Sequence, residues 1–160
     1  HKNLKQANRL MKYYSLNHQS PVTDFKEATI KGQAPDKGLY FPERIPQVPP
    51  AVLQNLQSLS REEIAYTVIQ PYVGDAIPEN DLRRIVAETV NFPIPLVQIK
   101  EGVYSLELFH GPTLAFKDIG ARFMSRCLGY FMGAQHQQKK SNSTGGYFRR
   151  YRWCRCQWLL

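Results

Sequence analysis

Apolar residues in the first half of the chain recur mainly at helical spacing. Residues 50–59 suit a helix that carries Pro50 in its first turn. The run Ser60-Arg61-Glu62-Glu63 has the form of a capping box and predicts the start of a second helix. We expect Pro71 to end or kink that helix, because proline lacks the backbone N–H that an interior position needs. A third helix is predicted from about Pro78 to Val90. Its apolar face comprises Leu82, Ile85, Val86 and Val90.

After Phe92-Pro93 the pattern changes to the alternation that is typical of strands. Two alternating runs, 96–99 and 103–108, flank a turn that contains Gly102 and predict a β-hairpin. A further helix is predicted from near Phe116, and Gly120 and Gly129 within it indicate close packing against neighbouring elements. The apolar face of this helix comprises Ile119, Phe123, Cys127 and Phe131.

Turn-forming residues punctuate the start of the chain. The run M-K-Y-Y-S-L-N-H from Met11 predicts a short strand, and Asp36-Lys37-Gly38 predicts a turn. We expect Gly38 to supply a positive φ there at little cost. Pro46, Pro49 and Pro50 mark a connector, and no internal repeat is found.

The composition is that of an ordinary globular protein, with its charge at the two ends. The 160 residues are 42% hydrophobic, which is enough for a domain with a core. No apolar run approaches the roughly 18 residues that span a bilayer. The first ten residues lack the apolar core of a signal peptide, so we expect a cytoplasmic protein. The net charge of +8 arises from residues 1–10 and 139–160, which hold basic residues and no acid.

The cysteines give a weak metal signal. Cys127 lies in the body of the chain, whereas Cys154 and Cys156 form a C-x-C near its end. A single C-x-C without a second cluster or a histidine pair falls short of the usual ligand sets, so we expect no metal site.

The stretch from Ser105 to Met124 carries the candidate chemistry. It reads S-L-E-L-F-H-G-P-T-L-A-F-K-D-I-G-A-R-F-M and leads from a strand through a His-Gly-Pro-Thr turn to Lys117, at a predicted helix start. Strand-to-helix junctions are where α/β enzymes commonly place reactive groups. A lone lysine is ordinarily a solvated surface residue. Here we expect an apolar setting suited to a reactive amine. Arg122, one turn on, adds a positive charge, whereas Asp118 acts the other way, so the direction of the pKa shift of Lys117 stays open. The residues that would form that setting are Phe109, Leu114, Ala115 and Phe116.

This stretch resembles the lysine motif of threonine synthases, which are pyridoxal 5'-phosphate (PLP) enzymes. The M-K-Y-Y-S opening is also similar to theirs, and so is the segment that follows it, and the resemblance extends over about residues 11–138. Matching positions in that segment are Ala28, Gly32, Ala34, Asp36, Gly38, Leu39, Tyr40 and Pro42. Tryptophan synthase β, cysteine synthase and threonine dehydratase, which share the fold, fit F-H-G-P-T-L-A-F-K-D less well.

The resemblance implies an α/β fold. A small, mostly helical N-terminal region with a β-hairpin would lead into the start of a PLP fold type II α/β domain, here truncated. Residues 11–92 would form the N-terminal domain and residues 93–138 the start of the PLP-binding region. Residues 1–10 would be an upstream or non-native extension, and residues 139–160 a frame-shifted tail.

The resemblance also implies the reaction. Threonine synthases convert O-phospho-L-homoserine and water to L-threonine and phosphate by a PLP-dependent β,γ-replacement. Lys117 would form the Schiff base with PLP and shuttle protons. The expected partner is therefore a small-molecule substrate rather than nucleic acid or a membrane. Candidates for a supporting role around Lys117 are His110, Gly111, Pro112, Thr113, Phe116 and Asp118.

The tail predicts a reading-frame error. Residues 141–160 show neither helical nor strand periodicity, and their composition switches to Arg, Trp and Cys. With one extra base before Ser141, the other frame can read V-T-V-L-V-A-T-S-G-D-T-G-G-A-V-A-N-G-F. Tryptophan has a single codon, so the shifted frame must read glycine at the positions that follow from Trp153 and Trp158. That segment resembles the element that follows the lysine helix in threonine synthases. The alternatives are an unusual natural tail and a chance product of codon freedom.

We expect the 160-residue chain itself to be inactive and poorly folded. Within the printed sequence the family's S-G-D-T-G turn and a later glycine-rich phosphate loop have no in-frame counterpart. Two other interpretations remain open. One is a basic-tailed module that binds nucleic acid through residues 139–160. The other is a non-catalytic fragment that pairs with an intact homologue.

Resequencing the DNA across Lys139-Lys140 tests the frame error. We expect the bases after Lys140 to encode V-T-V-L-V-A-T-S-G-D-T-G in one of the other two frames. A sequence that encodes this segment in no frame would leave the present tail as the natural one.

Overall fold

The structure is a computed structural model that describes residues 10–141, and its residues cluster into two compact units. Among the described residues, the first unit extends to Glu88 and the second begins at Thr89. The elements of the first unit are β1 (Tyr13–Ser15), α1 (Phe25–Lys31), β2 (Tyr40–Pro42), α2 (Pro50–Gln54), α3 (Arg61–Val73) and α4 (Glu79–Thr89, whose last residue falls in the second unit). Those of the second unit are β3 (Leu96–Lys100), β4 (Val103–Leu106) and α5 (Asp118–Ser141).

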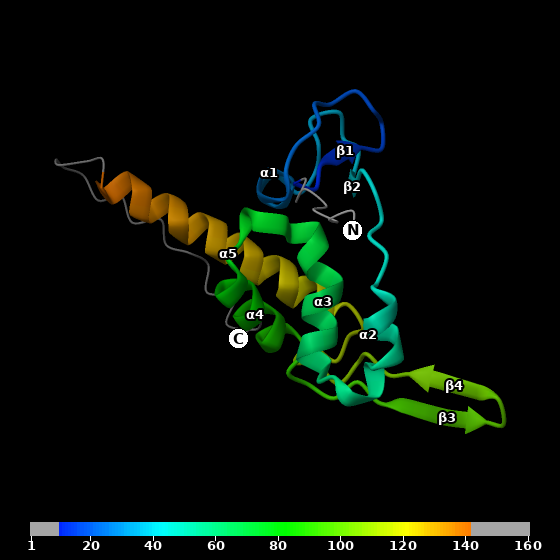
Figure 1. Cartoon of the computed structure of the whole chain (residues 1–160). Coiled ribbons are helices and arrows are strands. Elements are labelled where there is room, and N and C mark those ends of the chain that lie inside the picture. The colour runs from blue at the N-terminus through cyan, green and yellow to red at the C-terminus, as the bar shows by residue number, and fades with distance from the viewer. Residues whose placement is uncertain (1–9, 142–160) are drawn as a thin grey trace, which may run out of the picture. The chain divides into compact units, whose positions relative to one another are not determined.

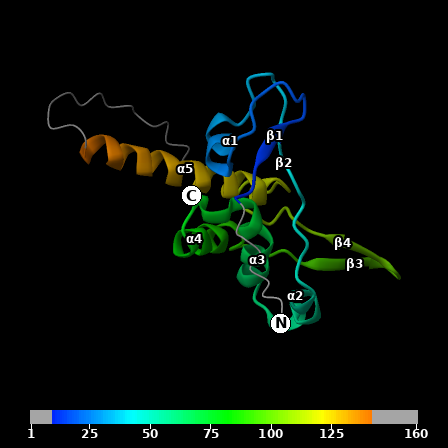
Figure 2. The same cartoon turned by 45° about the horizontal axis from the view of Figure 1, so that its top comes forward.

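A small apolar core joins β1, β2 and α1. The two strands pair antiparallel, with Tyr13 opposite Pro42, and α1 lies beside them in both views (Figure 1, Figure 2). The core residues are Met11, Tyr13 and Ala28, with Phe25 and Tyr40 packed against them. The Tyr13 hydroxyl donates to the carbonyl of Tyr72 at 2.8 Å, and burial raises the pKa of Tyr13. The predicted strand after Met11 is therefore confirmed, and it forms one wall of this core.

The turn at Asp36 is built around one carboxylate. Asp36 accepts hydrogen bonds from the buried Ser15 hydroxyl at 2.6 Å and from the N–H groups of Gln19 and Gly38 at 3.0 and 2.9 Å. These bonds, the one from Ser15 first, lower the pKa of Asp36 to about 2.

The predicted role of Gly38 in this turn is wrong. The left-handed backbone belongs to Lys37, at a φ of 66°. A Cβ on Gly38 would overlap the Ser15 hydroxyl and lie 3.0 Å from the backbone nitrogen of Asn17. Glycine is needed at this position for space rather than for a positive φ.

The helices of the first unit follow the predicted signals in part. The capping box of α3 is confirmed, since Glu63 N–H donates to the Ser60 hydroxyl at 3.2 Å and Ser60 N–H to the Glu63 carboxylate at 2.8 Å. The expectation that Pro71 ends or kinks α3 is wrong for the end, because the helix continues to Val73, and stays a prediction for the kink. Pro71 lies in the last turn, so only one hydrogen bond near the helix end is lost.

The predicted helix over residues 50–59 is also shorter than expected. The α-helix α2 ends at Gln54, and a 3₁₀ turn occupies Leu56–Ser58. The Asn55 side chain donates to the Ala51 carbonyl at 2.8 Å. An asparagine amide that bonds the local backbone in this way competes with continuation of the helix.

The apolar face of α4 is confirmed. Both termini of α4 lie within one residue of the predicted bounds, Pro78 and Val90. Its predicted core residues are at most 6% exposed. These residues are Leu82, Ile85, Val86 and, just beyond the helix, Val90.

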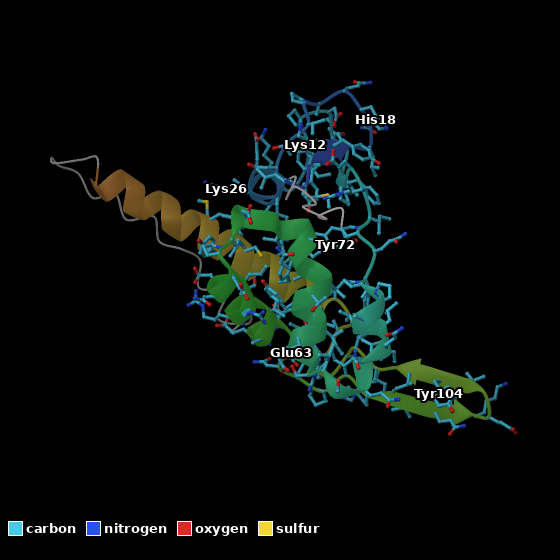
Figure 3. All side chains as sticks on the ribbon, in the orientation of Figure 1. Lys12, His18, Lys26, Glu63, Tyr72 and Tyr104 are labelled. Atoms are coloured by element: carbon cyan, nitrogen blue, oxygen red, sulfur yellow. The ribbon has the colours of Figure 1, made fainter. Side chains whose placement is uncertain are left out.

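The predicted hairpin is confirmed, and both of its faces are exposed. Strands β3 and β4 pair antiparallel from Leu96 opposite Leu106, with Gly102 at a φ of 72° in the turn. Strand β4 ends at Leu106 rather than at residue 108. Both views show the hairpin extending away from α5, and Tyr104, labelled in Figure 3, is 55% exposed (Figures 1–3). A lone two-stranded hairpin is marginally stable in water.

The helix α5 buries the end of its predicted face. Cys127 and Phe131 are fully buried, whereas Ile119 and Phe123 are partly buried. The close packing expected at Gly120 and Gly129 is wrong, because a Cβ at either position would meet nothing within 4 Å. These two glycines face open space in the described part of the chain.

Two findings concern residues 10–141 only. None of their helices combines the length and the hydropathy needed to cross a membrane. No three of their histidine, cysteine, aspartate and glutamate side chains gather where they could hold a metal ion. The C-x-C and the extension and tail predictions fall mostly on residues 1–9 and 142–160, which lie outside the described residues.

Two glycine substitutions test the space at these positions. We expect Gly38→Ala to destabilise the chain by about 1–3 kcal/mol, because its Cβ must displace the Ser15 hydroxyl from Asp36. Gly120→Ala is the matched control and should stabilise by about 1 kcal/mol, since the Cβ meets open space in a helix. Urea unfolding followed by circular dichroism measures both. A neutral Gly38→Ala would contradict the proposed need for space.

Candidate active site

Lys117 lies at the start of α5 with an exposed side chain. Its carbonyl accepts the N–H of Ala121 at 2.9 Å, so it stands immediately before the first helical residue, Asp118. The predicted position of the lysine at a helix start is confirmed. Its amine is accessible on the outside of the second unit.

The loop before Lys117 is a succession of tight turns. Leu114 N–H donates to the Gly111 carbonyl at 3.0 Å, and Asp118 N–H donates to the Ala115 carbonyl at 3.1 Å. Leu114 has a φ of 56°, a left-handed conformation that is uncommon for a residue with a branched side chain. The short turns leave the backbone around Lys117 little freedom.

A buried carboxylate holds this loop. Asp118 is 1% exposed and accepts two hydrogen bonds from Thr113, one from the backbone N–H at 2.9 Å and one from the hydroxyl. These bonds, the hydroxyl's first, lower the pKa of Asp118. Gly111 packs so closely that a Cβ there would lie 2.9 Å from the Asp118 Cβ. We call Thr113 and Asp118, with Gly111 against them, the Thr113–Asp118 latch.

Arg122 extends the latch by one helical turn. It is 4% exposed, and its guanidinium donates to the Asn91 side-chain oxygen at 2.7 Å and lies 5.7 Å from the centre of the Phe92 ring. Its positive charge further lowers the pKa of Asp118. Sequence reasoning placed Arg122 beside the lysine and missed Asn91. The spacing of Asp118 and Arg122, four residues apart at a helix start, is the signal that could have shown that the two charges interact, as the effect of Arg122 on the pKa of Asp118 indicates.

The remaining predicted residues lie on the exposed surface of the loop. His110 is exposed and pairs with Glu107, Nε2 to Oε2 at 2.6 Å, with its ring 4.7 Å from that of Phe109. Pro112 is exposed, and Phe116 is 74% exposed. The latch thus brings together Gly111, Thr113 and Asp118, while His110, Pro112 and Phe116 lie on the surface of the loop.

The expected apolar setting of Lys117 is wrong for the described residues. Phe109, Leu114 and Phe116 are 47%, 76% and 74% exposed. The tight turns of the loop point these side chains outward, and only Ala115 among the four expected residues is partly buried. An apolar environment cannot be read from neighbours in sequence, because it requires segments that pack over them.

Comparison with known proteins identifies relatives over most of the chain. A family model described as "Threonine synthase N terminus" matches residues 12–90. The threonine synthase of Haemophilus influenzae is 37% identical over 123 residues, which are 77% of this chain and 28% of that protein. The threonine synthase of Saccharomyces cerevisiae is 39% identical over 132 residues, covering 75% of this chain and 26% of its own. The chain therefore spans little more than a quarter of the length of these relatives.

Solved structures agree with these matches. The PLP-bound threonine synthase from Brucella melitensis superposes with a TM-score of 0.74 at 38% identity, over 79% of this chain and 28% of that chain. The yeast enzyme gives a TM-score of 0.71 at 34% identity, over 87% of this chain and 29% of its own. The predicted α/β fold is confirmed over the part of the chain that superposes.

The pH dependence of stability tests the buried Asp118 carboxylate. Because the folded state lowers its pKa, the ionised form stabilises the fold above about pH 4, the ordinary carboxyl value, and this contribution is lost as the pH falls through the lower folded value. We expect Asp118→Asn to be clearly less stable than the parent near pH 7 and to approach it near pH 3.

Urea unfolding at both pH values measures this difference. The control is Asp81→Asn, which removes an exposed carboxylate paired with Arg84 and should change stability by less than about 1 kcal/mol. A difference between Asp118→Asn and the parent that stays constant from pH 7 to 3 would show that the carboxylate is not preferentially ionised in the fold.

Proposed function

The chain belongs to the threonine synthase family, and from that premise we propose that Lys117 is the residue that holds PLP covalently. The observation that carries the proposal is the exposed lysine at the start of α5, in a chain 38% identical to a PLP-bound threonine synthase. The neighbouring Thr113–Asp118 latch supports it, because it orders the backbone that presents the amine.

The proposed reaction converts O-phospho-L-homoserine and water to L-threonine and phosphate. The bond between Cγ and the phosphate oxygen breaks, the water oxygen bonds to Cβ, and Cγ becomes the methyl group of threonine. PLP, when bound, withdraws electrons from the substrate carbons and so eases the loss of their protons. We assign to Lys117 the transfer of these protons, because the residue that holds PLP brings its amine next to the substrate carbons.

The residues of the loop fit this cofactor in part. Lys117 offers an accessible amine, and the exposed Phe116 and Leu114 offer apolar surface beside it. We propose His110, Pro112 and Phe116 as residues that shape the surface near the cofactor. Gly111, Thr113 and Asp118 would act through the loop. The groups that hold the cofactor phosphate would come from the part of the family fold that has no counterpart in this chain.

The division of the chain follows from the same proposal. Residues 11–92 would be the N-terminal domain and residues 93–138 the start of the PLP-binding region of a cytoplasmic enzyme. Because the chain spans 28% of the Haemophilus influenzae relative, we propose that the 160-residue chain by itself lacks turnover. No contact among residues 10–141 favours a nucleic-acid-binding module, whose proposed tail lies mainly outside them.

Borohydride reduction in the presence of PLP tests the assignment of Lys117. We expect mass spectrometry of peptides to find the reduced cofactor on Lys117 in preference to Lys100, an exposed lysine of β3. Lys117→Arg should abolish the selective label, and Lys100→Arg should leave it unchanged. Labelling spread evenly over the exposed lysines would refute the assignment.

Phosphate release tests the activity separately. With O-phospho-L-homoserine and PLP, the 160-residue chain should release no more phosphate than the Lys117→Arg variant. Release above that background would refute the proposed lack of turnover while supporting the family reaction.

A further inference from the structure

We propose that Thr113 and Asp118 are positioning residues that fix Lys117 in place and do not themselves touch the cofactor. This inference rests on the proposed function of Lys117. It assigns to two residues of the motif a role that acts through Lys117. Their proximity to the lysine in the sequence does not distinguish this role from direct contact with the cofactor.

The latch closes a short loop around the lysine. Asp118 accepts both hydrogen bonds from Thr113, and only four residues, 114–117, lie between the two. Within this closed loop Asp118 N–H also donates to the Ala115 carbonyl at 3.1 Å. Lys117 is the last residue inside the loop and the one that precedes the helix. Its backbone is therefore held from both sides, while its side chain extends outside.

Both hydrogen-bond donors of Thr113 are already engaged, although the residue is exposed. A threonine hydroxyl has one proton to donate, and that of Thr113 goes to Asp118 Oδ1. The other carboxylate oxygen, Oδ2, accepts the Thr113 N–H at 2.9 Å. Asp118 is 1% exposed, so a ligand beside the exposed Lys117 amine does not reach its carboxylate. Successive helical residues also point about 100° apart around the axis, which separates residue 118 from residue 117.

Arg122 anchors the latch to the chain that leads into the hairpin. Its guanidinium donates to Asn91 at 2.7 Å, five residues before β3 begins, whereas Thr113 lies seven residues after β4 ends. The segments that enter and leave the hairpin are thus held by the first turns of the same helix. A loose latch would release the loop from α5 and leave the Lys117 amine without a fixed direction.

Two variants of Thr113 isolate the hydroxyl. Thr113→Val keeps the size of the side chain and the backbone bond to Asp118 but removes the hydroxyl bond. Thr113→Ser restores a hydroxyl and serves as the rescue variant. Circular dichroism reports whether each variant of the full 160-residue chain remains folded.

The experiment combines two measurements on the same proteins. Amide hydrogen exchange of Leu114 and Asp118, whose N–H groups donate within the loop, reports its closure, and we expect Thr113→Val to accelerate this exchange about 10-fold, the effect of one lost bond to a charged acceptor. The ratio of borohydride-fixed PLP on Lys117 to that on Lys100 reports the placement of the amine. We expect this ratio to fall several-fold in Thr113→Val and to return in Thr113→Ser.

Each outcome decides a separate point. Exchange that does not accelerate in Thr113→Val overturns the latch, and accelerated exchange with an unchanged labelling ratio overturns its positioning role. A parent chain that shows no preference for Lys117 contradicts the proposed function instead. In that case the exchange measurement still decides whether Thr113 and Asp118 hold the loop closed.

Discussion

The carboxylate of Asp118 is the constraint on which the candidate site depends. It is buried at the first position of α5, and two hydrogen bonds from Thr113 satisfy it. A buried carboxylate without partners would be costly, so the loop must return to the helix start to supply them. That return sets where α5 begins and excludes a side chain at Gly111. It also leaves Lys117, like Phe116 before it, exposed at the junction.

The first unit contains a similar aspartate-centred set of hydrogen bonds, around Asp36. Asp36 accepts a hydroxyl bond from Ser15 and two backbone N–H bonds, and a Cβ at the neighbouring Gly38 would overlap that hydroxyl. In both loops an aspartate gathers a hydroxyl and backbone donors, and a glycine provides the room. Such bonds to an ionised acceptor are stronger than neutral ones, which suits them to holding an irregular loop that lacks strand or helix pairing.

The two regions differ in what surrounds them. The Asp36 turn lies beside the small core of Met11, Tyr13 and Ala28. The loop at Lys117 instead presents Leu114 and Phe116 with about three-quarters of each side chain exposed, and the adjoining hairpin is exposed on both faces. Hydrogen bonds therefore order the lysine loop, with little contribution from apolar burial of its own side chains. The chain covers 28% of the PLP-bound threonine synthase from Brucella melitensis.

The sequence by itself determined the features that neighbours along the chain control. The capping box at Ser60, the buried face of α4, the hairpin around Gly102 and the lysine at a helix start all depend on residues within about one helical turn or one strand pair of each other. The motif at Lys117 also resembles that of the threonine synthase family, to which the chain belongs. Local hydrogen bonds and side-chain periodicity depend only on which residues are close together in the sequence.

Only the tertiary structure decided which positions are crowded and which are open. Gly38 lacks space because Ser15, which is distant in the sequence, lies against it. Gly120 and Gly129 face open space, although both lie in the interior of a helix. Asp118 is buried and Phe116 is exposed, the reverse of what their polarity suggests. Burial and the room for a Cβ depend on segments far apart in the sequence, and residue order alone does not specify how closely they approach.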